Sequence, residues 1–190
     1  MATPAKRRAT YDDLCALPEH VVGEIIDGEL VVSPRPAPIH ANATSTIGGD
    51  LGPPFGRGRG GPGGWWILDE PELHLGEDVL VPDIAGWRKS RMPALPLTAY
   101  FALAPDWVCE VLSPSTVAVD RARKLRIYAR EKILDLWLVD PQARTLEVFH
   151  LGEAGWILTA VHHGDEVVRV EPFAAVELEL AAWWDTGRSE

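Results

Sequence analysis

Cysteine is scarce in this sequence, which has two, Cys15 and Cys109, among 190 residues. Two cysteines without a recognisable spacing form no disulfide framework of the kind that holds small secreted domains together. Cys109 lies in a predicted core strand, and buried cysteines behave as small hydrophobic side chains. We therefore expect both to be buried or free thiols in a reducing cytoplasm.

Long hydrophobic runs are also missing. No apolar run reaches the roughly 18 residues that a membrane-spanning helix needs. The basic residues near the N-terminus are not followed by the apolar segment of a secretory signal. These absences predict a cytoplasmic protein without a membrane partner.

Positive charge is in short supply, with 18 Lys and Arg against 28 Asp and Glu and a net charge of −10. This balance argues against a protein that coats nucleic acid through bulk charge. The balance reverses between Ser115 and Lys132, where six basic residues stand against two acidic ones. A local basic element in an acidic protein suits a phosphate-binding site, although a solvated helix face has the same composition.

The remaining composition, 46% hydrophobic and 24% charged, is ordinary for a globular protein. The patterns predict a disordered lead-in at residues 1–9 and one mixed α/β (α+β) domain at residues 10–190. The expected elements are a short helix at 10–14, a hairpin at 21–32 that turns at Asp27-Gly28, a helix at 39–51, a flexible glycine-rich loop at 56–64, strands at 65–68 and 72–75, a strand at 79–87, a strand at 107–112 with a basic helix after it, a strand at 133–139 and a hairpin at 145–162.

Two carboxylates interrupt strands that otherwise read as buried. Glu110 stands inside the apolar run from Trp107 to Leu112, and Asp83 follows Pro82 in the middle of the strand at 79–87. A buried, unpaired carboxylate costs several kcal/mol. Glu110 therefore lies at a strand end near solvent, pairs with a cation, or binds a metal ion.

Lys124 completes a candidate site. On the basic helix, Val117, Arg121, Lys124 and Tyr128 form one stripe, which we expect to face the sheet. Two carboxylates from adjacent strands make an oxygen site suited to Mg²⁺ or Mn²⁺. A nearby lysine can orient water or neutralise charge on a phosphate, and the helix, with Arg121 and Arg123, can steer a phosphate backbone. The combination favours metal-assisted phosphodiester chemistry over a structural ion pair.

These residues also carry a resemblance. The sequence resembles the PD-(D/E)xK nuclease superfamily and, more closely, the Uma-two family of bacterial endonucleases, over roughly residues 11–180. The matching segments are Gly23-Glu24-Ile25-Ile26-Asp27-Gly28-Glu29-Leu30, Val32-Ser33-Pro34, His40, Pro82-Asp83, Glu110-Val111-Leu112-Ser113-Pro114-Ser115-Thr116, Asp120-Arg121, Lys124, Tyr128 and Leu136-Trp137-Leu138-Val139-Asp140-Pro141.

The resemblance implies a restriction-endonuclease-like core: a four-stranded central sheet flanked by helices, here with added N- and C-terminal β-hairpins. It implies that Asp83 and Glu110 hold Mg²⁺, with Mn²⁺ as a substitute, and that the substrate is DNA. The superfamily lysine is displaced, because Leu112 stands at its usual position and Lys124 is the match on the following helix. Glu24 and His40 are additional site candidates, His40 as a proton shuttle or phosphate contact. A homodimer is expected, since cutting both strands takes two sites.

Two functions from different classes follow. The first is a Mg²⁺-dependent endonuclease in which Asp83, Glu110 and Lys124 are catalytic. The alternative is a catalytically inactive nuclease-like module that binds nucleic acid or a protein partner, which the net charge and the displaced lysine favour. A small-molecule metalloenzyme is a weaker third reading, because the sequence has no apolar cofactor signature.

Overall fold

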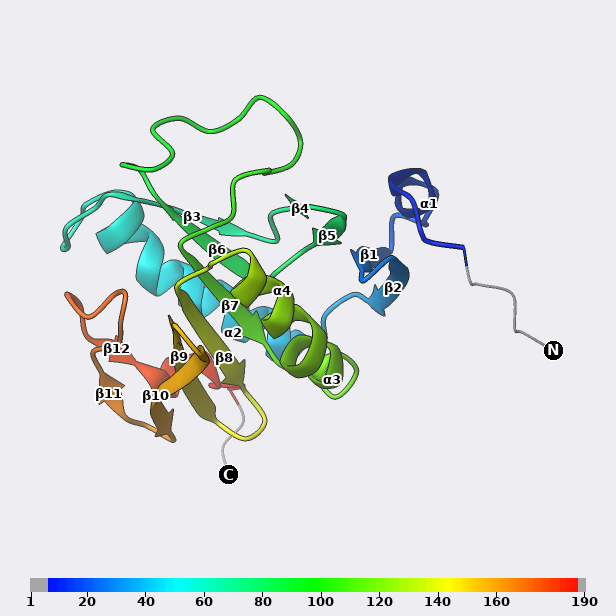
Figure 1. Ribbon diagram of the computed structural model, residues 1–190. Helices are drawn as coiled ribbons and strands as arrows, with labels where there is room; N and C mark the ends of the chain where they lie inside the picture. Colours follow the sequence, from blue (N-terminus) through cyan, green and yellow to red (C-terminus); the bar gives the residue numbers. More distant parts are fainter. Residues whose placement is uncertain (1–6, 188–190) are drawn as a thin grey trace.

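Two β-sheets organise the chain in the computed structural model, which describes residues 7–187 (Figure 1). The larger sheet is mixed and has six strands. From edge to edge they are β10 (Gly155–His163), β9 (Thr145–Gly152), β8 (Asp135–Asp140), β7 (Trp107–Val111), β6 (Ile84–Arg88) and β3 (Trp65–Asp69). Only β7 and β8 are parallel; their crossover carries the basic helical segment.

The smaller sheet is antiparallel and has four strands. Their order is β2 (Glu29–Pro34), β1 (Val21–Ile26), β5 (Asp78–Leu80) and β4 (Leu73–Leu75). The predicted hairpin at 21–32 is confirmed as β1–β2. Asp27 and Gly28 at its turn have φ values of 54° and 78°, the positive values that a tight two-residue hairpin turn requires. The predicted strand at 72–75 is found as β4.

The six-stranded sheet has helices on both faces. On one face lies α2 (Pro38–Leu51), which ends in the π-helical turn η1 (Gly52–Gly56). Ala43, Ile47 and Leu51 of α2 are buried, as their four-residue spacing predicts. On the other face a continuous helical segment consists of α3 (Val117–Val119), the π-helical turn η2 (Asp120–Lys124) and α4 (Leu125–Arg130).

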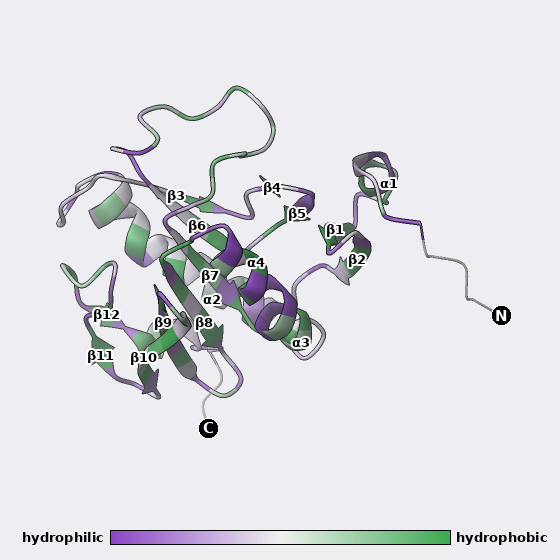
Figure 2. Cartoon of the chain, viewed as in Figure 1, coloured by the Kyte–Doolittle hydropathy of each residue, from purple (hydrophilic) through white to green (hydrophobic). Residues whose placement is uncertain are grey.

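Side-chain alternation in β7 divides the core between these faces. Trp107, Cys109 and Val111 belong to the core that includes α2, whereas Val108 belongs to the core that includes α4. Glu110 therefore points toward the helical segment after β7. Figure 2 shows hydrophobic colouring on the central strands and hydrophilic stretches on α4, whose outer face meets solvent.

The predicted strand at 79–87 is wrong as a single element. It is divided into β5 and β6, which belong to different sheets, with Pro82-Asp83 between them. Proline has no N–H for a ladder, so the chain leaves one sheet there and enters the other. Asp83 consequently lies at the junction of the two sheets.

The central sheet has six strands where the resemblance implied four, because the C-terminal hairpin β9–β10 continues it. The N-terminal hairpin joins the smaller sheet instead, through Ile25 and Val79. The remaining elements near the C-terminus are β11 (Val167–Val168), β12 (Leu178–Glu179) and the 3₁₀ turn η3 (Leu180–Trp183).

The N-terminal end of the described chain is tied to the smaller sheet. Residues 1–6 of the predicted lead-in lie outside the described residues, while Ala9 N donates to Gly28 O at 2.8 Å. Helix α1 (Tyr11–Cys15) follows, with a capping box between Thr10 and Asp13. Over residues 7–187, none of the helices is both long enough and apolar enough to cross a membrane.

Candidate active site

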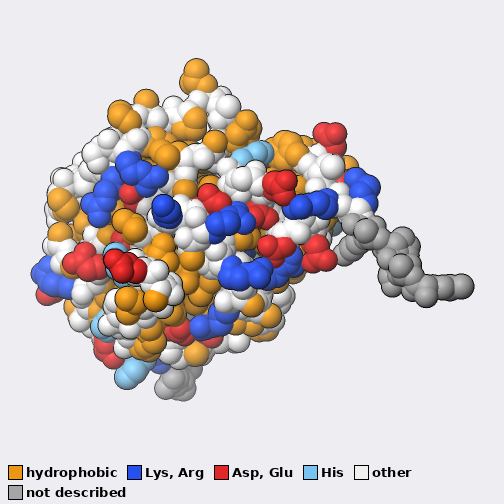
Figure 3. All heavy atoms as spheres, viewed as in Figure 1, with side chains coloured by type: hydrophobic (Ala, Val, Ile, Leu, Met, Phe, Trp, Pro, Cys, Tyr) orange, Lys and Arg blue, Asp and Glu red, His pale blue; other side chains and the backbone are white. Residues whose placement is uncertain are grey.

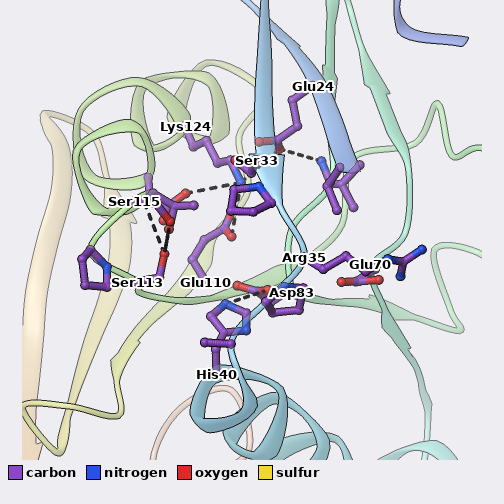
Figure 4. Close-up of a pocket in the computed structure, with 18 residues that line it drawn as sticks. Glu24, Ser33, Arg35, His40, Glu70, Asp83, Glu110, Ser113, Ser115 and Lys124 are labelled. Carbon is purple, nitrogen blue, oxygen red and sulfur yellow. Dashed lines mark hydrogen bonds and ion pairs between the residues drawn. The ribbon is translucent and has the colours of Figure 1, made fainter. Parts of the chain in front are cut away.

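A cleft of about 280 Å³ opens where the two sheets meet (Figure 4). Its walls come from β1, β2, the N-terminal turn of α2, the junction before β6, the end of β7 and the start of the helical segment. Five carboxylates line it against three basic side chains: Glu24, Glu70, Asp83, Glu110 and Asp120 against Arg35, His40 and Lys124. Asp83, Glu110, Lys124, Glu24 and His40, all predicted from the sequence, thus share one cleft.

Lys124 lies at the centre of a buried ionic cluster. Its Nζ is 3.0 Å from Glu24 Oε1, 3.2 Å from Glu110 Oε1 and 3.3 Å from Asp120 Oδ1. Glu24 comes from β1, Glu110 from β7 and Asp120 from the same helical segment as the lysine. Burial lowers the pKa of Lys124, but the carboxylates, Glu110 first, outweigh burial and raise it well above its usual value. The lysine is therefore a permanent cation.

The turn η2 decides which residue accompanies Lys124. The predicted stripe through Arg121 is wrong at that position: Asp120 is buried beside Lys124, and Arg121 is exposed. Over η2 the hydrogen bonds run from i to i+5, and Leu125 N donates to Asp120 O. The wider turn changes the angular position of each side chain, so an ideal-helix stripe does not hold across it.

Glu110 is held by two donors. Tyr128 OH donates to Glu110 Oε1 at 2.5 Å, and Lys124 contacts both carboxylate oxygens. Burial raises the pKa of Glu110 well above its usual value, and the attraction of Lys124 opposes this only in part. Burial, followed by the nearby Glu110, likewise raises the pKa of Tyr128. Burial also raises the pKa of Asp120. The cluster therefore contains three carboxyl groups around a single lysine.

Asp83 lies beside Glu110 because β6 and β7 are antiparallel with Ile84 opposite Cys109. Its Oδ2 accepts from Val111 N at 2.7 Å, and its Oδ1 is 3.2 Å from His40 Nε2. Burial lowers the pKa of His40, but its bond and charge interaction with Asp83 outweigh burial and raise the pKa. His40 Nδ1 is buried and has no hydrogen-bond partner within residues 7–187. It is a free polar atom at the cleft.

The donor set fits a magnesium ion. Within residues 7–187, no group of three or more Asp, Glu, His or Cys side chains is arranged so that it could hold a metal ion. Mg²⁺ does not need one, because it keeps several waters and is usually bound by one or two carboxylates with substrate phosphates. Asp83 and Glu110 could supply those two carboxylates in a cleft that has five carboxyl groups against three basic side chains.

Arg121 and Arg123, predicted to contact nucleic acid, do not line the cleft. Arg121 makes two hydrogen bonds to Glu147, at 2.9 and 2.5 Å. Arg123 is 3.3 Å from Asp27 Oδ2 and 3.1 Å from Glu29 Oε2. Both guanidinium groups are therefore already paired, and their contact with nucleic acid stays a prediction.

Two buried site residues received no role from the sequence. Asp120 appears there only as part of the family resemblance, and Tyr128 appears in the resemblance and in the stripe expected to face the sheet. The available signal was the spacing of Asp120, Lys124 and Tyr128 at i, i+4 and i+8, which puts them on neighbouring turns of one helix.

The comparisons with known proteins agree with the family resemblance of the sequence. The Uma2 family model, described as "Putative restriction endonuclease", matches residues 8–182. The crystal structure of a "putative nuclease" from Anabaena variabilis has a TM-score of 0.69 and 25% identity to this chain, with 93% of this chain and 97% of that chain covered. An uncharacterized Synechocystis protein is 29% identical over 110 residues.

The match to the Synechocystis protein spans 53% of this chain and 58% of that protein. The family model, by contrast, spans both sheets and every residue of the cleft. It confirms the resemblance that the motifs at Glu24, Pro82-Asp83 and Glu110 predicted. The chain belongs to the Uma2 family, whose members are described as putative restriction endonucleases.

Proposed function

We propose that this protein is a Mg²⁺-dependent endonuclease that hydrolyses phosphodiester bonds in DNA. The observation that carries the proposal is the position of Asp83, directly before β6, beside Glu110 on the neighbouring β7, with the buried cation Lys124 next to Glu110 in an open cleft. A restriction-endonuclease-like core presents an acidic pair and a lysine in this manner. The family match supports the same reaction class.

Asp83 and Glu110 would hold the ion. When bound, Mg²⁺ lowers the pKa of a coordinated water and offsets charge on the phosphate. The chain fixes both carboxylates beforehand, Asp83 through Val111 N and Glu110 through Tyr128 OH. A ligand held by such outer hydrogen bonds loses little freedom when it binds.

Lys124 would orient the attacking water and stabilise charge on the phosphate oxygens. Its ammonium has three N–H groups, and three carboxylates surround it. A water or phosphate oxygen reaches Nζ only by displacing one of them. Glu110 and Glu24 would each keep a second donor after release, Tyr128 OH and Val81 N respectively.

Glu24 and His40 have supporting roles in this proposal. Glu24 Oε1 accepts from Val81 N at 2.8 Å and from Lys124, so it fixes the lysine to the smaller sheet. His40 pairs with Asp83, and its buried Nδ1 has no hydrogen-bond partner among the described residues, which suits a phosphate contact or a proton shuttle.

The test is cleavage of supercoiled plasmid with Mg²⁺ or Mn²⁺, together with calorimetric Mn²⁺ binding. Asp83→Asn and Glu110→Gln keep side-chain size and remove the charge, and we expect each to abolish cleavage and weaken Mn²⁺ binding at least tenfold. Glu153→Gln, an exposed residue in the β9–β10 turn, is the matched control. Cleavage that survives both site substitutions would show that the nuclease is elsewhere or is a contaminant.

The alternative is an inactive nuclease-like module that binds nucleic acid or a protein. Its specific support is the complete pairing of Lys124, which leaves no N–H directed at open space. This alternative is favoured if the folded wild type binds DNA, fails to cut it with either ion, and keeps its affinity in Asp83→Asn.

We also propose that a second copy of the chain takes part, because cutting both strands of a duplex takes two sites. Light scattering of the protein alone and with duplex measures this. A mass near twice 20.9 kDa is expected for the protein, and a monomer in both conditions would contradict the homodimer.

A further inference from the structure

Unpaired positive charge gathers at one place on this acidic protein. Among residues 7–187 most arginines and lysines form ion pairs with carboxylates, as Arg121, Arg126 and Arg130 do. The described cations without a carboxylate partner are Arg35, Arg57, Arg59, Arg88, Lys89 and Lys132. Four of these six belong to two adjoining segments, the loop after η1 and the end of β6.

Direct contacts join the two segments. Lys89 Nζ donates to Gly56 O at 2.8 Å, and Lys89 N donates to Gly64 O at 2.8 Å. The loop from Gly56 to Gly64 is thus fixed against the end of β6. We call Arg57, Arg59, Arg88 and Lys89 the loop–β6 basic surface. Figure 3 shows basic side chains gathered at the upper left, over the region where Figure 1 labels β3, whereas acidic and basic side chains alternate on the right.

Aromatic rings hold two of these cations without neutralising them. The Arg88 guanidinium lies 4.4 Å from the centre of the Trp65 ring, and Lys89 Nζ lies 4.4 Å from that of Trp66. A ring face attracts a cation but carries no net charge, so the positive charge stays available to an anion. The neighbouring carboxylate, Asp106, is already paired with Arg91 at 2.8 Å.

The loop also offers open backbone. Gly60 and Gly64 have φ values of 79° and 88°, and a side chain at either position would meet nothing within 4 Å. A broad anion can therefore approach the main chain closely at Gly60 and Gly64, and the nearby Arg57 and Arg59 are both exposed. Such a surface favours an extended polyanion with regularly spaced charges over a single small anion.

We propose that the loop–β6 basic surface binds the phosphate backbone of double-stranded DNA and seats the duplex for cleavage; this rests on the proposed nuclease function. Arg88 ends the strand that begins next to Asp83, roughly 17 Å away at about 3.3 Å per residue. Phosphates along one DNA strand are about 3.4 Å apart along the axis, so the surface lies about five base pairs from the cleft. The cations position the duplex and carry no base specificity.

The experiment measures binding of a fluorescent duplex by anisotropy, in EDTA to prevent cleavage, over a range of salt concentrations. The variants are Arg57→Gln with Arg59→Gln, and Arg88→Gln with Lys89→Gln. The matched control is Arg8→Gln with Arg169→Gln, which removes the same charge from exposed positions outside both the surface and the basic helical segment. Circular dichroism checks the fold of each protein.

Each surface variant should bind the duplex about thirtyfold more weakly at 0.15 M salt, and its log–log salt slope should fall by about 2, as the loss of two phosphate contacts requires. The control should stay within about threefold of wild type, as distant surface charge alone affects affinity little. Equal losses in control and surface variants would overturn the proposal, as would wild-type affinity in both surface variants or no duplex binding by the wild type.

The same proteins separate this inference from the proposed function. If the wild type cuts plasmid while the surface variants bind and cut as it does, the nuclease proposal stands and the surface assignment is wrong. If the surface variants lose duplex affinity but the wild type never cuts with Mg²⁺ or Mn²⁺, the surface assignment stands and the nuclease proposal is wrong.

Discussion

Tyr128 donates its phenolic proton to Glu110 across 2.5 Å inside the protein, from a helix to the neighbouring strand. Both side chains are almost fully buried. The hydrogen bond gives the proposed metal ligand a fixed orientation and links the basic helical segment to the sheet. The same hydrogen bond should therefore affect both the free energy of unfolding and the affinity of the site for a metal ion.

Tyr128→Phe should separate these two contributions. Loss of a buried hydrogen bond to a carboxyl group should lower the free energy of unfolding by about 1.5–3 kcal/mol. Tyr128 donates a hydrogen bond to the proposed metal ligand Glu110, and loss of such a partner should weaken Mn²⁺ binding about 10- to 100-fold. Urea unfolding and calorimetry measure the two effects.

The matched control is Tyr100→Phe. Tyr100 stacks on His74 at 3.9 Å, and its hydroxyl makes no hydrogen bond within residues 7–187. This variant should match the wild type in both measurements. Unchanged Mn²⁺ affinity in Tyr128→Phe would contradict the positioning role of the tyrosine.

Lys124→Met should leave Glu24, Glu110 and Asp120 buried without their cation. Removing one partner of a buried ionic cluster typically costs about 3–5 kcal/mol. In the folded variant Glu110 and Asp120 stay buried, and burial holds the pKa of each carboxyl above its usual value, so the folded state binds protons more tightly. The loss of stability should therefore be largest at about pH 7 and shrink toward about pH 5. Urea unfolding at both pH values measures it.

Lys132→Met is the control, because Lys132 is exposed and has no carboxylate partner within residues 7–187. Its unfolding free energy should change by less than about 0.5 kcal/mol at either pH. If the loss in Lys124→Met did not depend on pH, the uncompensated carboxylates would not be its cause.

Asp50 should affect stability through its own ionisation. Its Oδ2 accepts from Trp183 Nε1 at 2.8 Å, and burial, more than any other cause, raises the pKa of its carboxyl. A raised pKa means that its contribution to stability is fully present below the unfolded pKa and is lost as pH rises through the folded value. Asp50→Asn keeps an acceptor without the charge, so it should raise Tm near pH 7, by an amount that shrinks toward pH 4.

Asp50→Ala provides the comparison, because it removes the acceptor and leaves the indole N–H unpaired. It should lower the free energy of unfolding by about 1–3 kcal/mol. Thermal unfolding of both variants over the same pH range is the measurement. A lower Tm for Asp50→Asn at pH 7 would contradict the direction of the pKa shift.

Two glycines should respond to alanine in opposite directions. A Cβ at Gly86 in β6 would lie 3.1 Å from Trp107 and 3.2 Å from Trp65, so Gly86→Ala should destabilise the fold by about 1–3 kcal/mol through overpacking. A Cβ at Gly49 in α2 would meet nothing within 4 Å, so Gly49→Ala should stabilise it by about 0.5–1 kcal/mol through helix propensity. Chemical denaturation of both tests the packing between the tryptophans.

Much of the site could be predicted because its signals are local. Glu110 stood out because a carboxylate interrupts an apolar strand, and Asp83 because a proline precedes it. Glu110 pairs with Lys124, as the second of the readings that the sequence left open predicts, and its binding of a metal ion stays a prediction. The hairpin around Asp27-Gly28 and the buried face of α2 could also be predicted, because turn geometry and helical period depend on neighbouring residues.

The remainder depends on contacts between distant segments. Asp120 is buried beside Lys124 and Arg121 is exposed across a π-helical turn, a backbone feature that the sequence analysis did not predict. Arg121 and Arg123 pair with Glu147 and with the β1–β2 hairpin, and a count of local charges does not include such partners. The predicted strand at 79–87 is divided because its first part pairs in the smaller sheet and its second part pairs in the larger sheet.

The division of that strand has a consequence for the order in which the protein is built. Glu24 is near the start of the chain, and the lysine it contacts is about a hundred residues later. A growing chain therefore has its first hairpin long before the helix that will complete the cluster exists. The cluster takes Glu24 from the smaller sheet and Glu110 from the larger one, so it is complete only in a molecule whose two sheets have come together.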